Sequence, residues 1–291
     1  MNIRILNILS IAIIALASCQ DVIDVPAPEG ESRLVVEAWL DDQARSQTIR
    51  ITETLPYFQN EFTPGITDAQ VVVSSSAGKT LVFEDQGNGD YVYDASSEVI
   101  GTVGDEFTLD IQTNGKSISA SATLNRVPAI DSIVQEFRDD SFGEGIYCNF
   151  FSRDPIGLGD TYWIKTYKNG EFLNKPLELN IAFDAGFSAG SEVDALIFIP
   201  PIRETMNPLT DTLSQSPWVQ GDIARVEIHS TNVETFFFLE SIRDQLLNSL
   251  NTIFAEPVVN TKGNLVNNTD DKEILGIFNV AAISSLELEI E

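Results

Sequence analysis

The chain has a single histidine, His229, and a single cysteine beyond its N-terminal segment, Cys148; these side chains could begin nucleophilic or metal chemistry. A zinc site or a Ser-His-Asp relay would rest on His229 alone, whereas the two residues together could form a thiol dyad. Cys148 lies between Tyr147 and Asn149 in an apolar segment, without a cationic sequence neighbour to activate the thiol. The pattern therefore favours a buried, reduced, structural cysteine, and we expect no catalytic residue and no enzyme.

Acidic residues could supply metal ligands or a catalytic pair. Asp85, Asn88 and Asp90 surround one turn and could offer oxygen ligands to Ca²⁺. The same spacing fits a hairpin turn at Asn88-Gly89 with solvated flanks, and this interpretation is favoured, so no cofactor or metal is expected. Among 44 acidic residues no single pair stands out, and glycoside hydrolysis by two carboxylates stays open on spacing alone.

Four aromatic residues in loops are the candidate contacts for a partner or ligand. Tyr57, Phe58 and Phe62 follow the second predicted strand, and Trp218 lies in a long proline-bearing loop. Exposed aromatic side chains on the loops of a sandwich suit sugar, peptide or protein contacts. The alternative, which the composition of folded proteins favours, is that they plug the ends of the sandwich.

Cys19 points to lipid chemistry. An apolar stretch runs from Ile5 to Ala17, which is shorter than the roughly 20 residues of a membrane-spanning helix. The sequence Leu16-Ala17-Ser18-Cys19 that follows resembles the lipobox of bacterial lipoproteins, in which the cysteine thiol is alkylated with diacylglycerol before cleavage. Residues 1–18 are thus expected to form a lipoprotein signal peptide, and the mature chain would be tethered to lipid through Cys19.

The residues after Cys19 and the overall charge indicate where the anchored protein acts. Asp21 and Asp24 resemble the surface-export signal of Bacteroidota lipoproteins, which favours the cell-surface face of the outer membrane over the periplasmic face. With Cys19 acylated, Cys148 has no partner for an intramolecular disulfide. The formal net charge of −27 argues against nucleic acid as a partner and against docking on anionic lipid.

Beyond the lipobox, the hydrophobic pattern predicts a mainly β chain. Residues 19–32 contain Pro26, Pro28 and Gly30 and are expected to form a lipidated tether. About seven short segments of period 2 between Leu34 and Leu124 predict an immunoglobulin-like β-sandwich over residues 33–127. Residues 128–291 are expected to form a second β-rich domain with one packed helix near 232–250.

This helix has a predicted start and a predicted apolar face. Thr231 and Glu234 have the spacing of a capping box. An apolar stripe that should face a sheet follows at helical spacing: Phe236, Leu239, Ile242, Leu246 and Leu250.

Landmarks along nearly the whole mature chain resemble a Bacteroidota outer-membrane lipoprotein family known as a domain of unknown function. They are Leu34–Leu40, Thr54–Phe58, Asp68–Val71, Gly89–Tyr91, Pro128–Ile133, Asp154-Pro155, Asp160–Trp163 and Gly276–Phe278. The resemblance implies a surface lipoprotein often encoded beside a TonB-dependent receptor, and it implies no established activity.

These features lead to one functional hypothesis and two alternatives. The leading hypothesis is a non-enzymatic accessory or ligand-binding partner of a TonB-dependent receptor in nutrient uptake. A structural or assembly component of an envelope complex is the second possibility. A cell-surface hydrolase is the third, and a cleft with clustered carboxylates would favour it.

Overall fold

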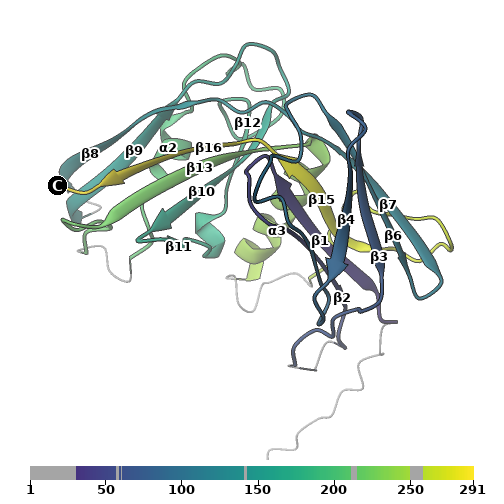
Figure 1. Ribbon diagram of the computed structural model, residues 1–291. Coiled ribbons are helices and arrows are strands. Elements are labelled where there is room, and N and C mark those ends of the chain that lie inside the picture. The colour runs from purple at the N-terminus through teal and green to yellow at the C-terminus, as the bar shows by residue number, and fades with distance from the viewer. Residues whose placement is uncertain (1–30, 57–58, 60, 141–142, 211–214, 250–257) are drawn as a thin grey trace, which may run out of the picture. The chain divides into compact units, whose positions relative to one another are not determined.

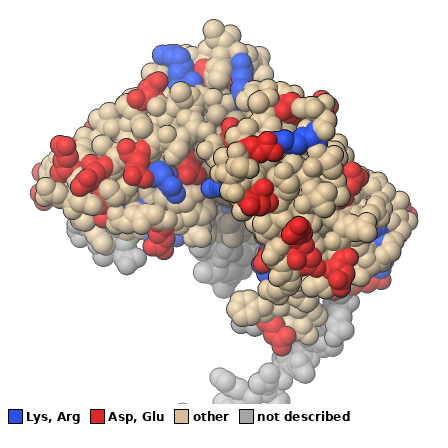
Figure 2. All heavy atoms as spheres, viewed as in Figure 1, with Lys and Arg blue, Asp and Glu red and all other residues tan. Residues whose placement is uncertain are grey.

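The computed structural model describes residues 31–56, 59, 61–140, 143–210, 215–249 and 258–291 (Figure 1). Ser32–Leu55 and Glu61–Glu291 form one compact unit, and every element below lies in it. The fold is mainly β with one long packed helix, as the sequence predicts. Acidic side chains are spread over the face in Figure 2 rather than gathered into one patch. Cys19, Tyr57 and Phe58 lie outside the described residues.

A nine-stranded sheet contains the N-terminal strands. Its spatial order is β14-β7-β6-β3-β4-β5-β2-β1-β15. The strands are β1 (Leu34–Asp41), β2 (Gln47–Glu53), β3 (Gln70–Ser75), β4 (Thr80–Asp85), β5 (Asp90–Tyr93), β6 (Glu106–Thr113), β7 (Lys116–Thr123), β14 (Val266–Asn267) and β15 (Leu275–Ala281). Strict alternation in β6 buries Phe107, Leu109 and Ile111 and exposes the residues between them, as expected for a strand with one solvated face.

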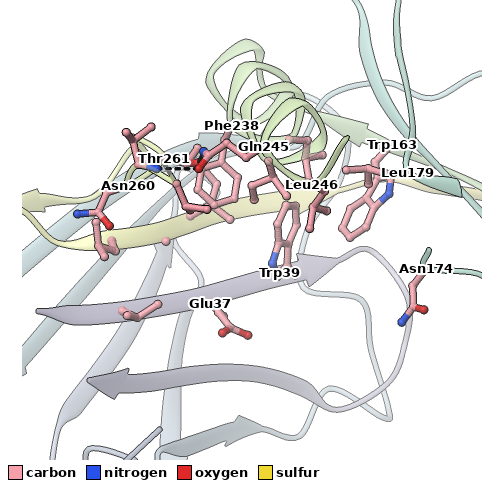
Figure 3. A pocket seen from close by; sticks show the side chains of 18 of the residues that line it. Glu37, Trp39, Trp163, Asn174, Leu179, Phe238, Gln245, Leu246, Asn260 and Thr261 are labelled. Atoms are coloured by element: carbon pink, nitrogen blue, oxygen red, sulfur yellow. Dashed lines mark hydrogen bonds between the residues drawn. The ribbon is translucent and has the colours of Figure 1, made fainter. Parts of the chain in front are cut away.

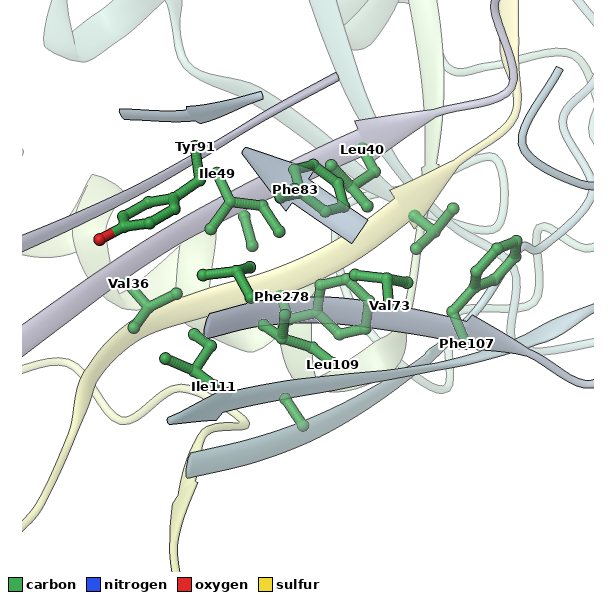
Figure 4. Packing of buried hydrophobic residues seen from close by; sticks show 14 of the residues in the cluster. Val36, Leu40, Ile49, Val73, Phe83, Tyr91, Phe107, Leu109, Ile111 and Phe278 are labelled. Carbon is green, nitrogen blue, oxygen red and sulfur yellow. The ribbon is translucent and has the colours of Figure 1, made fainter. Parts of the chain in front are cut away.

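The sheet folds over on itself at β4. The first part of β4 pairs with β3, whereas Glu84 and Asp85 pair with β5. The two halves therefore face each other across one core, in which Val36 and Ile49 pack with Val73 and Leu109 (Figure 4). This arrangement has the two packed layers of a β-sandwich.

Strand β15 joins this sheet from the far end of the chain. It pairs in parallel with β1, with Val36 opposite Gly276 and Ala38 opposite Phe278. Phe278 and Val280 are fully buried in the first core. The division into residues 33–127 and 128–291 stays a prediction, but the first sheet takes two strands, β14 and β15, from the second segment.

A second sheet and a two-stranded ribbon form the rest of the β-structure. The sheet has the order β11-β10-β13-β16, with β12 paired to β10, and the ribbon pairs β8 with β9. These strands are β8 (Ile130–Asp140), β9 (Gly143–Ser152), β10 (Thr161–Lys168), β11 (Glu171–Phe172), β12 (Asn180–Phe183), β13 (Ile223–Thr231) and β16 (Ile283–Glu289). One face of the sheet packs Ile164 and Ile228 against Phe150 of the ribbon and Trp218, and this cluster is the second core of the molecule.

Three helical segments accompany the second sheet: η1 (Pro176–Glu178), α2 (Pro200–Glu204) and α3 (Val233–Ser249). The N-terminal half of the predicted stripe on α3 is buried, since Phe236 and Leu239 pack with Ile277 of β15. Leu246, further along, is 39% exposed, so the stripe leaves the core before the helix ends. Leu250 lies outside the described residues. Over the part of the chain that is described, no helix has both the length and the apolar character needed to cross a membrane.

The predicted capping residue of α3 is wrong by one position. Thr231 is the last residue of β13, and its hydroxyl donates to Thr161 Oγ1 at 2.9 Å. Asn232 precedes the helix instead, and its Oδ1 accepts a hydrogen bond from the Thr123 amide at 3.0 Å. Pairing of β13 with β10 thus continues through Thr231 and leaves Asn232 to tie the start of the helix to β7.

Candidate functional site

An apolar cavity of about 580 Å³ lies between α3 and the outer face of the β1–β15 pair. Val35, Trp39 and Ile277 contribute from the strands, and Phe238 and Leu246 from the helix, as Figure 3 shows for the labelled residues. The remaining lining residues are Glu37, Trp163, Phe172, Leu173, Asn174, Leu179, Leu239, Ile242, Gln245, Val258, Val259, Asn260, Thr261, Leu275 and Gly276.

The cavity exists because β1 and β15 carry apolar residues on both faces. Val36 of β1 points into the sandwich core, whereas Val35 and Trp39, which have the opposite parity in the strand, line the cavity on the other side. In β15, Phe278 lies in the sandwich core and Ile277 in the cluster beneath α3. Parallel strands with both faces covered have this composition. The helix covers part of the outer face and leaves the rest open to a ligand.

Aromatic rings form the end of the cavity toward the second sheet. The Trp39 and Trp163 rings are 5.0 Å apart between centroids, at an angle of 60°. Phe172 of β11 meets Trp163 edge-on at 6.2 Å. Such tilted and edge-to-face pairs are favourable arrangements of aromatic quadrupoles.

A smaller polar chamber of about 90 Å³ shares the two tryptophans with this cavity. Its polar lining comprises Asp41, Arg45, Lys165, His229, Thr231 and Asn279. Arg45 Nε donates to Asp41 Oδ2 at 3.1 Å, and His229 Nε2 lies 2.9 Å from Glu227 Oε2. Burial lowers the pKa of His229, and the nearby Lys165 ammonium lowers it further, against the opposing effect of Glu227.

A few polar side chains also line the apolar cavity. Gln245 of α3 donates to Thr261 Oγ1 at 2.9 Å and accepts from the Val259 amide at 3.0 Å, which holds the segment after residue 257 against the helix (Figure 3). Glu37 is the single charged residue of the described lining, and it is exposed. The site therefore combines a largely apolar interior with a few polar groups, as small-molecule sites commonly do.

The structure describes two of the four aromatic residues that are predicted to contact a partner or ligand, and it places them in different environments. Trp218 is fully buried, and its Nε1 donates to Asn207 Oδ1 at 3.0 Å. This corrects its assignment as a partner contact: its size and apolar surface place it in the second core, and Asn207 satisfies its single donor. Phe62 is fully exposed, so its role as a contact stays a prediction. Tyr57 and Phe58 are outside the described residues.

Cys148 and His229 do not form a thiol dyad. Cys148 is a free, fully buried cysteine in the core with Ile228. His229, the next residue of β13, points to the opposite face of the sheet, where it lines the polar chamber. Burial raises the pKa of the Cys148 thiol to about 12, with a further contribution from Glu136. The thiol is therefore unsuited to act as a nucleophile near neutral pH.

No Gly-x-Ser-x-Gly elbow is expected from the sequence, but the chain does contain this pattern of residues at Gly186-Phe187-Ser188-Ala189-Gly190. In hydrolases this motif needs a strand-to-helix turn that presents the serine. Here it follows β12 in a surface turn, Ser188 is exposed, and its carbonyl accepts from the Ser191 hydroxyl at 2.8 Å. The match lacks the setting of a nucleophile elbow.

The candidate Ca²⁺ ligands have partners within the protein. Asp85 Oδ1 accepts from the Gly87 amide at 2.7 Å, and Asp90 pairs with Arg50 at 2.9 Å. Asn88 and Gly89 adopt positive φ values of 53° and 84°, as a tight turn between β4 and β5 requires. These contacts support the hairpin interpretation.

Three aspartates form an acidic cluster, but they are separated along the chain, so sequence spacing does not reveal the cluster. Carboxylate oxygens of Asp154, Asp160 and Asp184 lie within 4.8 Å of one another. Each has protein donors: the Tyr162 hydroxyl for Asp154, Arg126 for Asp160, and the Gly159 amide for Asp184. Burial raises the pKa of Asp154 to about 6, with added repulsion from the other two carboxylates.

Comparison with known families gives one match, which spans residues 20–287 and is described as a domain of unknown function, DUF4249. The chain belongs to the DUF4249 family. No curated protein matches it. All residues of the cavity and of the polar chamber lie inside the DUF4249 match.

An interpretation of β1 as one alternating strand does not reveal the residues that line the cavity. In Leu34–Leu40, only Glu37 is charged, and both parities are otherwise apolar. This is the signal of a strand covered on two sides, and it could have identified Val35 and Trp39. Nothing local relates them to Trp163 or Phe238.

Proposed function

We propose that this DUF4249 protein is a lipid-anchored, surface-facing outer-membrane protein that binds an apolar ligand between α3 and the β1–β15 pair. In this proposal it is not an enzyme, and it works as an accessory of a TonB-dependent receptor in nutrient uptake. The observation that carries the ligand-binding part is the apolar cavity of about 580 Å³. Its volume is in the range of about 300–1,000 Å³ that is usual for small-molecule sites.

The anchoring part of the proposal rests on the N-terminal sequence. Leu16-Ala17-Ser18-Cys19 resembles a lipobox, and the family match begins at residue 20, directly after the cysteine. A lipid anchor would keep an apolar-ligand binder beside the receptor that takes up its ligand. Several acyl chains make release from the membrane negligible, since each buried methylene contributes about 0.8 kcal/mol.

Binding of a fluorescent apolar probe, N-phenyl-1-naphthylamine, tests ligand binding. The natural chain should bind the probe, and Leu246→Glu should weaken binding at least about tenfold because it places a charge on the cavity wall. Val233→Glu is the matched control, since Val233 is 40% exposed on the same helix and does not line the cavity. Equal probe binding by the two variants would show that the cavity is not the site.

Purification from detergent-solubilised outer membrane tests the partner. The natural chain should bring down a TonB-dependent receptor, and Cys19→Ala, which removes the lipidation site, should be lost from the membrane fraction. Recovery of envelope-assembly machinery in place of a receptor would favour the structural alternative.

A further inference from the structure

The ammonium group of Lys165 lies against the aromatic rings that form one end of the apolar cavity, although Lys165 does not line that cavity itself. Its Nζ lies 4.0 Å from the centroid of the Trp163 ring and 5.9 Å from that of Phe172, and both rings line the cavity. Lys165 also lines the polar chamber behind the Trp39–Trp163 pair. One cation thus stands at the junction of the apolar and polar spaces.

This ammonium lacks an anionic partner among the described residues. Within the part of the chain that the structure describes, no carboxylate lies within ion-pair distance of Lys165 and no hydrogen bond to its ammonium is formed. Its basic neighbours are paired: Arg45 with Asp41, Lys168 with Asp222 at 2.8 Å, and Arg225 with Glu227 at 3.6 Å. In a chain with 44 acidic residues, a half-buried lysine without a carboxylate is a specific feature.

Burial makes the unpaired positive charge of Lys165 energetically costly. It also makes contact between this charge and an anionic group of a ligand favourable. Burial lowers the pKa of Lys165 to about 8, although Glu227 and Asp41 raise it from a distance. The group is therefore still largely protonated at neutral pH. A desolvated cation gains more from a contacting anion than a solvated one does, because water no longer screens the pair.

From this geometry we infer that the site takes an amphipathic ligand, with an aliphatic body in the cavity beneath α3 and an anionic carboxylate on Lys165. This inference rests on the proposed ligand binding and adds the chemical class of the ligand. The competing feature is Glu37, which could select a cationic end group. Glu37 is exposed on the edge of the cavity, and a solvated carboxylate gains little from an ion pair.

Three matched probes distinguish the two features: dodecanoate, 1-dodecanol and dodecylamine, each titrated below its micelle concentration. Changes in tryptophan fluorescence report binding, because Trp39 and Trp163 line the site. Trp218→Phe identifies any signal from the remaining tryptophan, which lies in the second core. Dodecanoate should bind about tenfold or more tighter than 1-dodecanol, as expected for one charge-assisted hydrogen bond.

Variants of Lys165 provide the second arm. Lys165→Met should remove the preference for dodecanoate and leave the affinity for 1-dodecanol unchanged, whereas Lys165→Arg should keep the preference. Lys79→Met is the control for the loss of one positive charge, because Lys79 lies in the turn before β4, where it contacts Glu98 and the Val99 carbonyl. Circular dichroism confirms that each variant is folded.

The pH dependence gives a readout that a structural role of Lys165 would not produce. From about pH 7 to about pH 9.5, dodecanoate affinity should fall as Lys165 loses its proton, and Lys165→Arg should flatten this decline. Of the other charged groups that face the ammonium, Glu227 has a lowered pKa and stays ionised, Arg45 has a raised pKa and stays charged, and the lowered pKa of His229 keeps it neutral.

Each outcome bears on a separate claim. Equal affinities for dodecanoate and 1-dodecanol would overturn the assignment of Lys165 while supporting an apolar-ligand site. If dodecylamine binds most tightly of the three, selectivity belongs to Glu37, and the assignment of Lys165 is also overturned. Failure of all three probes to bind would reject both the ligand class and the proposed function.

Discussion

At the scale of single residues, Asn207 organises the second core. Its Oδ1 accepts from the Cys148 amide at 2.7 Å and from Trp218 Nε1 at 3.0 Å, and its Nδ2 donates to the Cys148 carbonyl at 2.9 Å. One side chain thus joins a loop tryptophan to strand β9. A sequence cannot show this, because Asn207 and Cys148 are distant along the chain and each has an ordinary local setting.

Asn207→Ala should therefore destabilise the protein by at least about 2 kcal/mol, because it leaves buried donors and an acceptor without partners. Urea denaturation followed by circular dichroism measures the change in the free energy of unfolding. Asn268→Ala is the control and should cost under about 1 kcal/mol, since the bond of Asn268 to Ser119 is exposed. Comparable losses in the two variants would mean that Asn207 does not clamp the core.

Asp154 gives a prediction for pH. Because burial raises its pKa in the folded protein to about 6, the folded state binds a proton more tightly than the unfolded state does. The stabilisation from this proton is fully present below about pH 4 and is lost as the pH rises through about 6. Asp154→Asn should then be more stable than the natural chain at pH 7 by about 1–3 kcal/mol.

This advantage of Asp154→Asn should shrink as the pH approaches about 4, where the natural carboxyl group is also neutral. Urea unfolding of both proteins across the pH range measures how the difference in the free energy of unfolding changes with pH. The amide keeps an oxygen that can accept from the Tyr162 hydroxyl, which now lies 2.7 Å from Asp154 Oδ1. A difference that is the same at every pH would contradict the assignment.

At the scale of elements, the sequence predicts structure well where one face of an element is solvated. Asn114-Gly115 joins β6 and β7 with positive φ at both residues, as its place between two alternating segments indicates. The hydrophobic pattern does not predict strand β15, although Gly276–Phe278 is one of the landmarks of the family resemblance. All but one of its residues are buried, so period-2 alternation is absent.

The predicted apolar stripe of helix α3 is buried along only part of its length. Leu239 is 3% exposed and Leu246 39% exposed, although both belong to the same predicted stripe. Leu239→Ala should cost about 2–5 kcal/mol, as for a buried leucine. Leu246→Ala should cost about 1 kcal/mol or less, because little packing is lost there. Thermal and urea unfolding measure both, and equal large losses would show that Leu246 is a core residue.

At the scale of the whole molecule, the candidate site depends on contacts between distant segments. Trp39 of β1 meets Trp163 of β10, while Ile277 of β15 and Phe238 of α3 complete the surroundings. The individual strands and the helix are predictable from periodicity, but their pairing is not. The outer face of the β1–β15 pair, helix α3 and Lys165 come together only through the pairing of strands that are distant in the sequence.

The parallel pairing of β1 with β15 leads to a test of how the molecule folds. Residues 33–127 alone lack Phe278 and Val280, which are fully buried in the first core, and they leave β1 as an open edge. This fragment should therefore lack a cooperative thermal transition and should aggregate, because a core loses two large side chains and a strand loses its partner.

Joining residues 263–283 to the end of this fragment through a flexible linker should restore cooperative unfolding. The added segment carries both β14, which pairs with β7, and β15, which pairs with β1. Circular dichroism melting and the dispersion of amide proton resonances compare the two proteins. If residues 33–127 alone melt as cooperatively and at the same temperature as the fusion, the first sandwich is an independent domain and β15 only covers it. If only the fusion folds, strand β15 is part of the first core, and the β1–β15 side of the cavity forms only once β15 has paired with β1.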